Sequence, residues 1–160
     1  MNTENNPKEL ISEIKKTLLL LEKNRKFYEN FQQKELPVLG KGTSSAMIIS
    51  QIVIDFYTGI ETIFHRISQF FGNSIDKSSW HKSLLKNMTL EIEDKRAAAI
   101  SDSTSSALDE LLRFRHFRRY YFDTEYDWER IEFIKKKYLQ AADGIKKDLY
   151  NFIAFLEKLA

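Results

Sequence analysis

The amino-acid sequence predicts an all-α fold, an antiparallel helix bundle of about four to five helices. Apolar residues recur at intervals of three or four along most of the chain, which is the spacing that places them on one side of a helix. Five glycines and two prolines leave few turn signals for a β protein. The length of 160 residues fits one unit with a buried core, so we expect residues 1–160 to form a single domain.

The first helix should begin at Pro7, because proline is favoured in the first turn of a helix. It should end before Pro37, because a proline in a helix interior removes a hydrogen bond and clashes with the preceding turn. We expect a loop over Leu36–Gly42. The apolar stripe of this helix consists of Leu10, Ile11, Ile14, Leu18 and Leu21, and it continues to Phe27 and Phe31.

The second helix should begin near Ser44 or Ser45, since either serine is a suitable N-cap. Gly72-Asn73 should end it. Its sequence is apolar on more than one face, which predicts a central helix with neighbours on several sides. The regularly spaced apolar residues are Ile48, Ile52, Phe56, Ile60, Phe64 and Ile67.

A shorter helix is predicted over Trp80–Met88, after a loop over Asn73–Ser79. The pattern over Glu91–Ile100 is mixed and predicts no single element. The next helix should be capped by Ser101 or Asp102 and should run to about Phe122.

A turn over Asp123–Tyr126 should lead to the last helix, which should begin near Asp127 and run almost to the end of the chain. One side of this helix is apolar throughout. Its residues are Ile131, Ile134, Tyr138, Ala142, Ile145, Leu149, Phe152 and Leu156.

The composition of the chain excludes several classes of functional site. The formal net charge is +2, so only a local cluster of basic residues would predict nucleic-acid binding. The chain has no cysteine, which excludes disulfides, thiolate metal sites and a cysteine nucleophile. The polar N-terminus does not resemble a signal peptide, and no uninterrupted apolar run approaches the roughly 20 residues that span a bilayer. We therefore expect a cytoplasmic protein that does not associate with a membrane.

The segment LLRFRHFRRYYF, residues 111–122, is the strongest functional signal in the chain. Arginine binds phosphate through two parallel hydrogen bonds, and aromatic side chains stack on bases, so this mixture predicts an RNA- or phosphate-binding helix. Its basic residues are Arg113, Arg115, His116, Arg118 and Arg119.

Ion pairing inside the bundle is the competing interpretation of these arginines. Tyr57 and Glu61, one turn apart in the second helix, are candidate polar partners, although ordinary bundle packing explains them equally well. Carboxylates close in sequence are further candidates, namely Asp109, Glu110, Asp123, Glu125, Asp127 and Glu129.

The three histidines are weaker candidates, because a lone helical histidine is more often structural than catalytic. His65 should pack within the bundle or at its rim, and His81 should cap its helix or line a pocket. There is no glycine-rich phosphate loop and no pattern of metal-ligating residues, so we expect neither a cofactor nor a metal ion.

Three separate blocks of the sequence resemble HepT-like proteins of the HEPN superfamily. They are Ser44–Ile67, Trp80–Met88 and Leu108–Ile131, and the resemblance covers roughly residues 40–135. It implies a helical bundle that forms a homodimer through its motif helices. It also implies a toxin of a toxin–antitoxin module, with a metal-independent ribonuclease site of the form Arg-x4-6-His at the dimer cleft. The implied partner is an MNT-type nucleotidyltransferase antitoxin.

The resemblance places Arg115 at the motif arginine and Tyr120 at the motif histidine. Phe122 stands where such toxins carry a tyrosine that the antitoxin can modify. Tyrosine has an ordinary pKa near 10 and is a poor general base at neutral pH, so the motif is degenerate. The resemblance therefore points to Arg115, His116 and Tyr120 as catalytic candidates, with His81 as a further phosphate-binding or substituting residue.

Three functions remain open on the sequence. The first is an RNA-binding toxin-module protein that cleaves RNA weakly without metal. The second is a non-catalytic protein of the same fold that pairs with a nucleotidyltransferase or nucleic acid. The third is an interaction protein whose arginines are all ion-paired.

Overall fold

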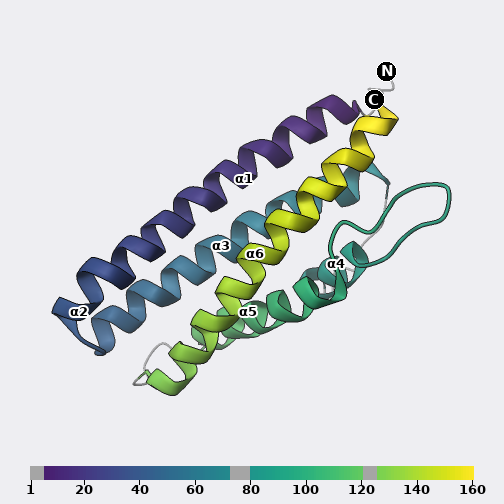
Figure 1. The fold of residues 1–160 in the computed structure, drawn as a ribbon. Coiled ribbons are helices and arrows are strands. Elements are labelled where there is room, and N and C mark those ends of the chain that lie inside the picture. Colours follow the sequence, from purple (N-terminus) through teal and green to yellow (C-terminus); the bar gives the residue numbers. More distant parts are fainter. Residues whose placement is uncertain (1–5, 73–79, 121–125) are drawn as a thin grey trace.

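The computed structural model describes residues 6–72, 80–120 and 126–160, and these residues form the all-α bundle that the sequence predicts. Its long helices are α1 (Pro7–Asn30), α3 (Thr43–Phe70) and α6 (Trp128–Leu159), which lie side by side (Figure 1). Helix α5 (Asp102–Tyr120) packs mainly against α6, and the short α4 (Trp80–Met88) contacts both α3 and α5. Helix α1 runs antiparallel to α3, and α5 runs antiparallel to α6, whereas α3 and α6 run in the same direction (Figure 1). The beginning of α1 and the end of α6 therefore lie at the same end of the bundle.

The helical path continues through Pro37, so the predicted end before this residue is wrong. A π-helical turn, Phe31–Glu35, follows α1 and leads into α2 (Leu36–Leu39). The amide of Leu36 donates to the carbonyl of Phe31, five residues back. A π turn widens the helix where proline brings no N–H and would crowd the preceding turn, and the chain can therefore pass it. The helix ends instead at Gly40, whose φ of 78° is readily adopted only by glycine.

Helix α3 is the central element of the bundle. It begins at Thr43 after Gly42, so neither predicted serine is its N-cap; Ser45 instead donates from Oγ to the carbonyl of Gly40 at 2.7 Å. By length and composition α3 could cross a membrane, but over half of its most apolar stretch is buried within the bundle. This is the behaviour of a core helix. As predicted, it ends next to Gly72, which has a φ of 70°.

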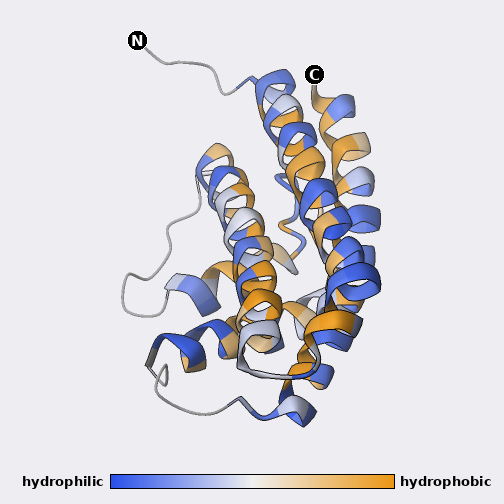
Figure 2. Cartoon of the chain, turned by 90° about the vertical axis from the view of Figure 1, so that its left-hand side faces the viewer, coloured by the Kyte–Doolittle hydropathy of each residue, from blue (hydrophilic) through white to orange (hydrophobic). Residues whose placement is uncertain are grey.

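The apolar faces of the helices point toward one another, and the charged faces point outward (Figure 2). A partly buried chain of hydrogen bonds ties three helices together. The hydroxyl of Tyr138 on α6 donates to Asn24 Oδ1 on α1 at 2.7 Å, and Asn24 Nδ2 donates to the carbonyl of Ile52 on α3 at 3.0 Å. Partnered in this way, the buried polar groups avoid the cost of lost hydration.

The segment from Thr89 to Ser101 is irregular, in agreement with its mixed sequence pattern. Arg96 within it is buried, and its Nη2 donates to the carbonyl and the side chain of Asn87 at the end of α4. Ser101 is the N-cap of α5, because its Oγ accepts from the amide of Thr104 at 3.2 Å. This contact decides between the two capping residues that the sequence left open.

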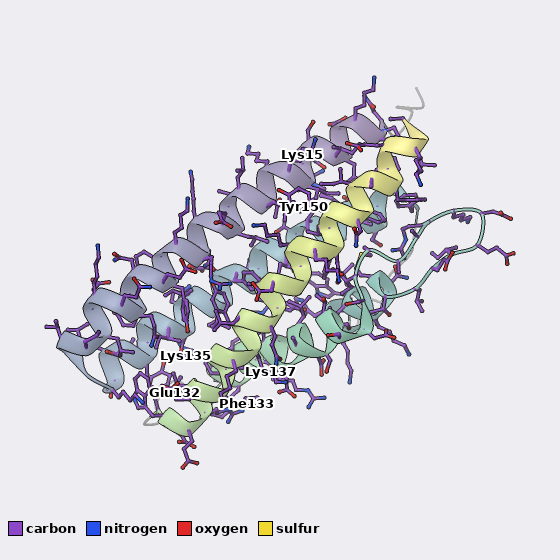
Figure 3. The ribbon with its side chains drawn as sticks, viewed as in Figure 1. Lys15, Glu132, Phe133, Lys135, Lys137 and Tyr150 are labelled. Atoms are coloured by element: carbon purple, nitrogen blue, oxygen red, sulfur yellow. The ribbon has the colours of Figure 1, made fainter. Side chains whose placement is uncertain are left out.

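Helix α6 begins as predicted, with Asp127 as its N-cap and an Oδ1 that accepts from the amide of Glu129. Further along, Glu132 binds Lys135 on the same helix (both labelled in Figure 3). Glu132 also binds Lys41 from the α2–α3 connection. The predicted loop over Asn73–Ser79 lies outside the described residues. So do Phe122 and most of the predicted turn over Asp123–Tyr126.

Candidate functional site

Arg115 points from α5 toward α3, where it forms an ion pair with Glu61. Its Nη2 donates to both carboxylate oxygens of Glu61, at 3.2 and 3.1 Å. Only 18% of the Arg115 side chain and 10% of the Glu61 side chain are exposed. The pair is therefore mostly removed from water, where a guanidinium requires a partner of opposite charge.

His81, from α4, reaches the same carboxylate. Its Nδ1 lies 2.7 Å from Glu61 Oε2 and 3.2 Å from Arg115 Nη2. An ionised carboxylate only accepts hydrogen bonds, so we assign the ring proton to Nδ1. Nδ1 of His81 and Nη2 of Arg115 then both donate to Glu61, and these two nitrogens lie close together because they share this acceptor. Three residues from three helices meet in this way, and we call Arg115, Glu61 and His81 the Arg115 site.

Tyr57 forms the floor beneath the guanidinium. The Cζ of Arg115 lies 4.7 Å from the centre of the Tyr57 ring, and its Nη1 donates to Thr58 Oγ1 at 3.4 Å. Burial raises the pKa of the Tyr57 hydroxyl far above its usual value; the charge of Glu61 raises it further, and Arg115 offsets part of the rise. Tyr57 therefore stays neutral at physiological pH and positions Arg115 without acting as a base.

The sequence interpretation that Glu61 supplies a polar partner to an arginine is confirmed for Arg115, whereas Tyr57 contacts Arg115 through the face of its ring. Among the described residues, the carboxylates nearer in sequence do not pair with Arg115, whereas Asp123 and Glu125 lie outside the described residues. Asp109 instead binds Arg113 at 3.0 Å, one turn away on α5, in a pair whose arginine side chain is 66% exposed. The competing ion-pair interpretation therefore holds for Arg113 and Arg115.

The other predicted site residues lie elsewhere on α5. Arg119 and His116 are exposed, and His116 leaves the helix about 100° from Arg115 because the two are adjacent in sequence. Arg118 is half-buried, with its Cζ 5.9 Å from the ring of Tyr126. Tyr120 ends the helix, and its side chain lies outside the described residues.

The pairing of His81 with Glu61 is the feature that sequence reasoning missed. Glu61 is a carboxylate inside the apolar stretch between Ile60 and Phe64, which was a signal for a buried charge in need of a partner. The sequence did not show that His81 would be this partner. The two residues belong to different helices, and nothing local links them.

The Arg115 site combines a hydrogen-bond donor for anions with an oriented imidazole. The guanidinium has five N–H donors and makes three hydrogen bonds, two to Glu61 and one to Thr58, so part of its donor capacity remains for a ligand. With Nδ1 held by Glu61, the opposite nitrogen of His81, Nε2, can accept a proton. The His81 side chain is 40% exposed, so solvent and solutes reach it.

Comparison with known proteins gives a family match that includes this region. A family model described as HepT-like protein matches residues 48–156, a range that includes α4, α5 and every residue of the Arg115 site. No curated protein and no solved structure matches the chain. Since the family model covers more than half of the chain and the fold is all-α, as the HEPN superfamily requires, the chain belongs to the HepT-like protein family.

Proposed function

We propose that this cytoplasmic HepT-like protein binds RNA at the Arg115 site and cleaves it slowly without a metal ion. The observation that carries the proposal is the position of His81. Its imidazole is held by Glu61 at 2.7 Å and lies 3.2 Å from Arg115, so an acid–base group and a phosphate-binding group share one site. This supplies the histidine that the motif position of Tyr120 lacks.

In the proposed reaction, Arg115 donates hydrogen bonds to the non-bridging oxygens of a phosphodiester. His81 Nε2 takes the proton of the ribose 2′-hydroxyl, and the 2′-oxygen attacks phosphorus. The bond from phosphorus to the 5′-oxygen breaks, and the imidazolium returns its proton to that oxygen. The products are a 2′,3′-cyclic phosphate and a 5′-hydroxyl, with protons and electron pairs in balance.

Glu61 has a positioning role in this scheme. It fixes the His81 ring with Nδ1 protonated and stabilises the imidazolium that forms during proton transfer. It also neutralises part of the charge of Arg115, which weakens the attraction for phosphate. We therefore expect cleavage that is slow compared with dedicated ribonucleases.

The test is RNA cleavage by the purified full chain in the presence of a metal chelator. His81→Ala and Arg115→Ala should each abolish cleavage, whereas His116→Ala, which removes an exposed histidine on α5, should leave it intact. No cleavage of varied RNAs at high protein concentration would refute the enzymatic proposal. Full activity of His81→Ala would refute the role of His81.

A second candidate function is a non-catalytic HepT-like protein that pairs with an MNT-type nucleotidyltransferase antitoxin. The observation in its favour is that Glu61 already binds Arg115 through both carboxylate oxygens. Under this hypothesis the wild type is inert toward RNA, Tyr120→His creates cleavage, and a neighbouring nucleotidyltransferase co-purifies with the protein. Cleavage by the wild type would contradict it.

We also propose that the functional form is a homodimer that pairs two copies of α5. Arg115 and Tyr120 are about 140° apart around one straight helix, so a single α5 does not bring the two motif positions into one site. A two-fold axis between two such helices would bring Arg115 of one copy near Tyr120 of the other. Light scattering well above micromolar concentration should give the mass of a dimer, and a monomer under these conditions would overturn the proposal.

A further inference from the structure

Trp80 is a large aromatic residue at the edge of the Arg115 site. It is the first residue of α4, and 36% of its surface is exposed. Its ring stacks on that of His81, with 3.8 Å between the ring centres and 33° between the planes. His65, an exposed residue of α3, lies with its ring centre 6.3 Å away at a steep angle of 65°. We call the rings of Trp80 and His65 the Trp80 wall.

The Trp80 wall and the Arg115 site meet at His81. His81 belongs to both, because its ring stacks on Trp80 while its Nδ1 contacts Glu61. A broad aromatic ring therefore lies one side chain away from a guanidinium. Proteins bind single-stranded RNA with this combination: a cation that holds the backbone and an aromatic ring on which a base stacks.

We propose that Trp80, with His65 beside it, forms a subsite that stacks one unpaired RNA base next to the phosphate at the Arg115 site. This proposal rests on the proposed function and adds the substrate class, which is single-stranded RNA. A base inside a duplex is stacked on its neighbours, so it has no free face for the indole of Trp80. Stacking on an indole accepts any base, so the subsite selects unpaired nucleotides and not a particular sequence.

The exposure of Trp80 favours binding over a purely structural role. A tryptophan that serves only the core is usually well buried, because its large apolar surface is costly to leave in water. Among the described residues, the acidic side chain in contact with His81 is Glu61, which is already paired with Arg115.

The experiment measures the binding of a short single-stranded RNA and of an abasic oligonucleotide of the same length to the full chain. Trp80→Ala should weaken RNA binding about 5- to 150-fold, which is the loss expected for one stacked base. Trp80→Phe should retain most of the affinity. The abasic oligonucleotide should bind the wild type and Trp80→Ala equally, because neither complex contains the stack.

Two controls separate binding from folding. Tyr150→Ala removes an aromatic side chain on α6 that is 53% exposed (Figure 3), and it should leave RNA binding unchanged. In a Trp128→Phe protein, Trp80 is the sole indole, since the chain has two tryptophans, and its fluorescence should change on addition of RNA but not of the abasic oligonucleotide. This measurement keeps Trp80 in place and so does not depend on the folding of Trp80→Ala.

Failure of the subsite is distinguishable from failure of the proposed function. If the wild type binds RNA and Arg115→Ala does not, while Trp80→Ala binds as tightly as the wild type, the subsite is refuted and the proposed function stands. Equal binding of RNA and abasic oligonucleotide by the wild type also refutes the subsite. If the wild type binds no RNA, both proposals are wrong.

Discussion

The imidazole of His81 and the carboxylate of Glu61 are joined by a hydrogen bond of 2.7 Å between Nδ1 and Oε2. Glu61 accepts from Arg115 at the same time, so one largely buried carboxylate organises both a base and a cation. Substitution of Glu61 should therefore affect catalysis and binding in different ways.

Glu61→Gln should lower the rate of RNA cleavage by roughly 10²–10⁴-fold, because an amide can hold the ring of His81 in the wrong tautomer and no longer stabilises its cation. RNA affinity should stay the same or increase, since Arg115 is no longer neutralised. Single-turnover rates and equilibrium binding measure the two effects. Glu93→Gln, an exposed carboxylate, is the control. A parallel loss of rate and affinity would contradict this division of roles.

Arg115→Ala should destabilise the protein far more than Arg113→Ala. Loss of Arg115 leaves a mostly buried carboxylate with His81 alone, and we expect the free energy of unfolding to fall by about 2–4 kcal/mol. Arg113 belongs to an exposed pair with Asp109, worth about 0–1 kcal/mol. Urea denaturation of both variants measures the difference. Equal losses would show that the pair of Arg115 with Glu61 contributes no more to the free energy of unfolding than the exposed pair of Arg113 with Asp109.

Gly144→Ala should destabilise the contact between α5 and α6. A methyl group at this position would collide with Oγ1 of Thr104 and crowd its Cβ. Overpacking of this kind costs about 1–3 kcal/mol, more than the roughly 1 kcal/mol that alanine gains over glycine in a helix.

Thermal unfolding measures this loss, and two further variants test its cause. Gly42→Ala, at the N-cap of α3, is a glycine-to-alanine change without a clash, because a methyl group there meets no atom within 4 Å; it should lose only the small preference of an N-cap for glycine over alanine. Adding Thr104→Ala to Gly144→Ala should restore part of the stability by removing the clashing hydroxyl. A neutral Gly144→Ala would show that the two helices shift apart without cost.

Stability should fall at alkaline pH. Burial raises the pKa of both Tyr57 and Tyr138 well above 10, their ordinary value. The stability that such tyrosines contribute is fully present at pH values below their pKa in the unfolded chain, because the hydroxyls are then protonated in both the folded and the unfolded state. It is lost as the pH rises above about 10, where the unfolded chain releases protons that the folded chain keeps.

The free energy of unfolding in urea should therefore decrease between pH 9 and pH 11, by up to about 1.4 kcal/mol per pH unit for each tyrosine. Tyr57→Phe removes one of the two titrating hydroxyls and should make the free energy of unfolding depend less steeply on pH. It leaves the hydrogen bond between Tyr138 and Asn24 in place. The same slope in the wild type and in Tyr57→Phe would exclude Tyr57 as a source.

Much of the fold follows from local sequence. The N-cap of α6 at Asp127 and the extent of α4 match their predictions, because capping residues and apolar spacing act within one helix. The N-cap of α3 is one exception, because it is Gly42 and neither predicted serine. Pro37 is another. Its local rule predicts a helix end, but a π turn before it lets the helix continue to Leu39.

The sequence by itself determined that this chain is a helical bundle, that α3 is central and that α5 carries the arginines. It also resembled the family to which the chain belongs. Only the tertiary structure decided what Arg115 contacts. Its partner Glu61 is 54 positions away, and His81 is 34 positions away. The spacing of residues along a helix defines its faces, but the packing of α3, α4 and α5 selects which faces meet, and that choice depends on the summed burial of all helices together.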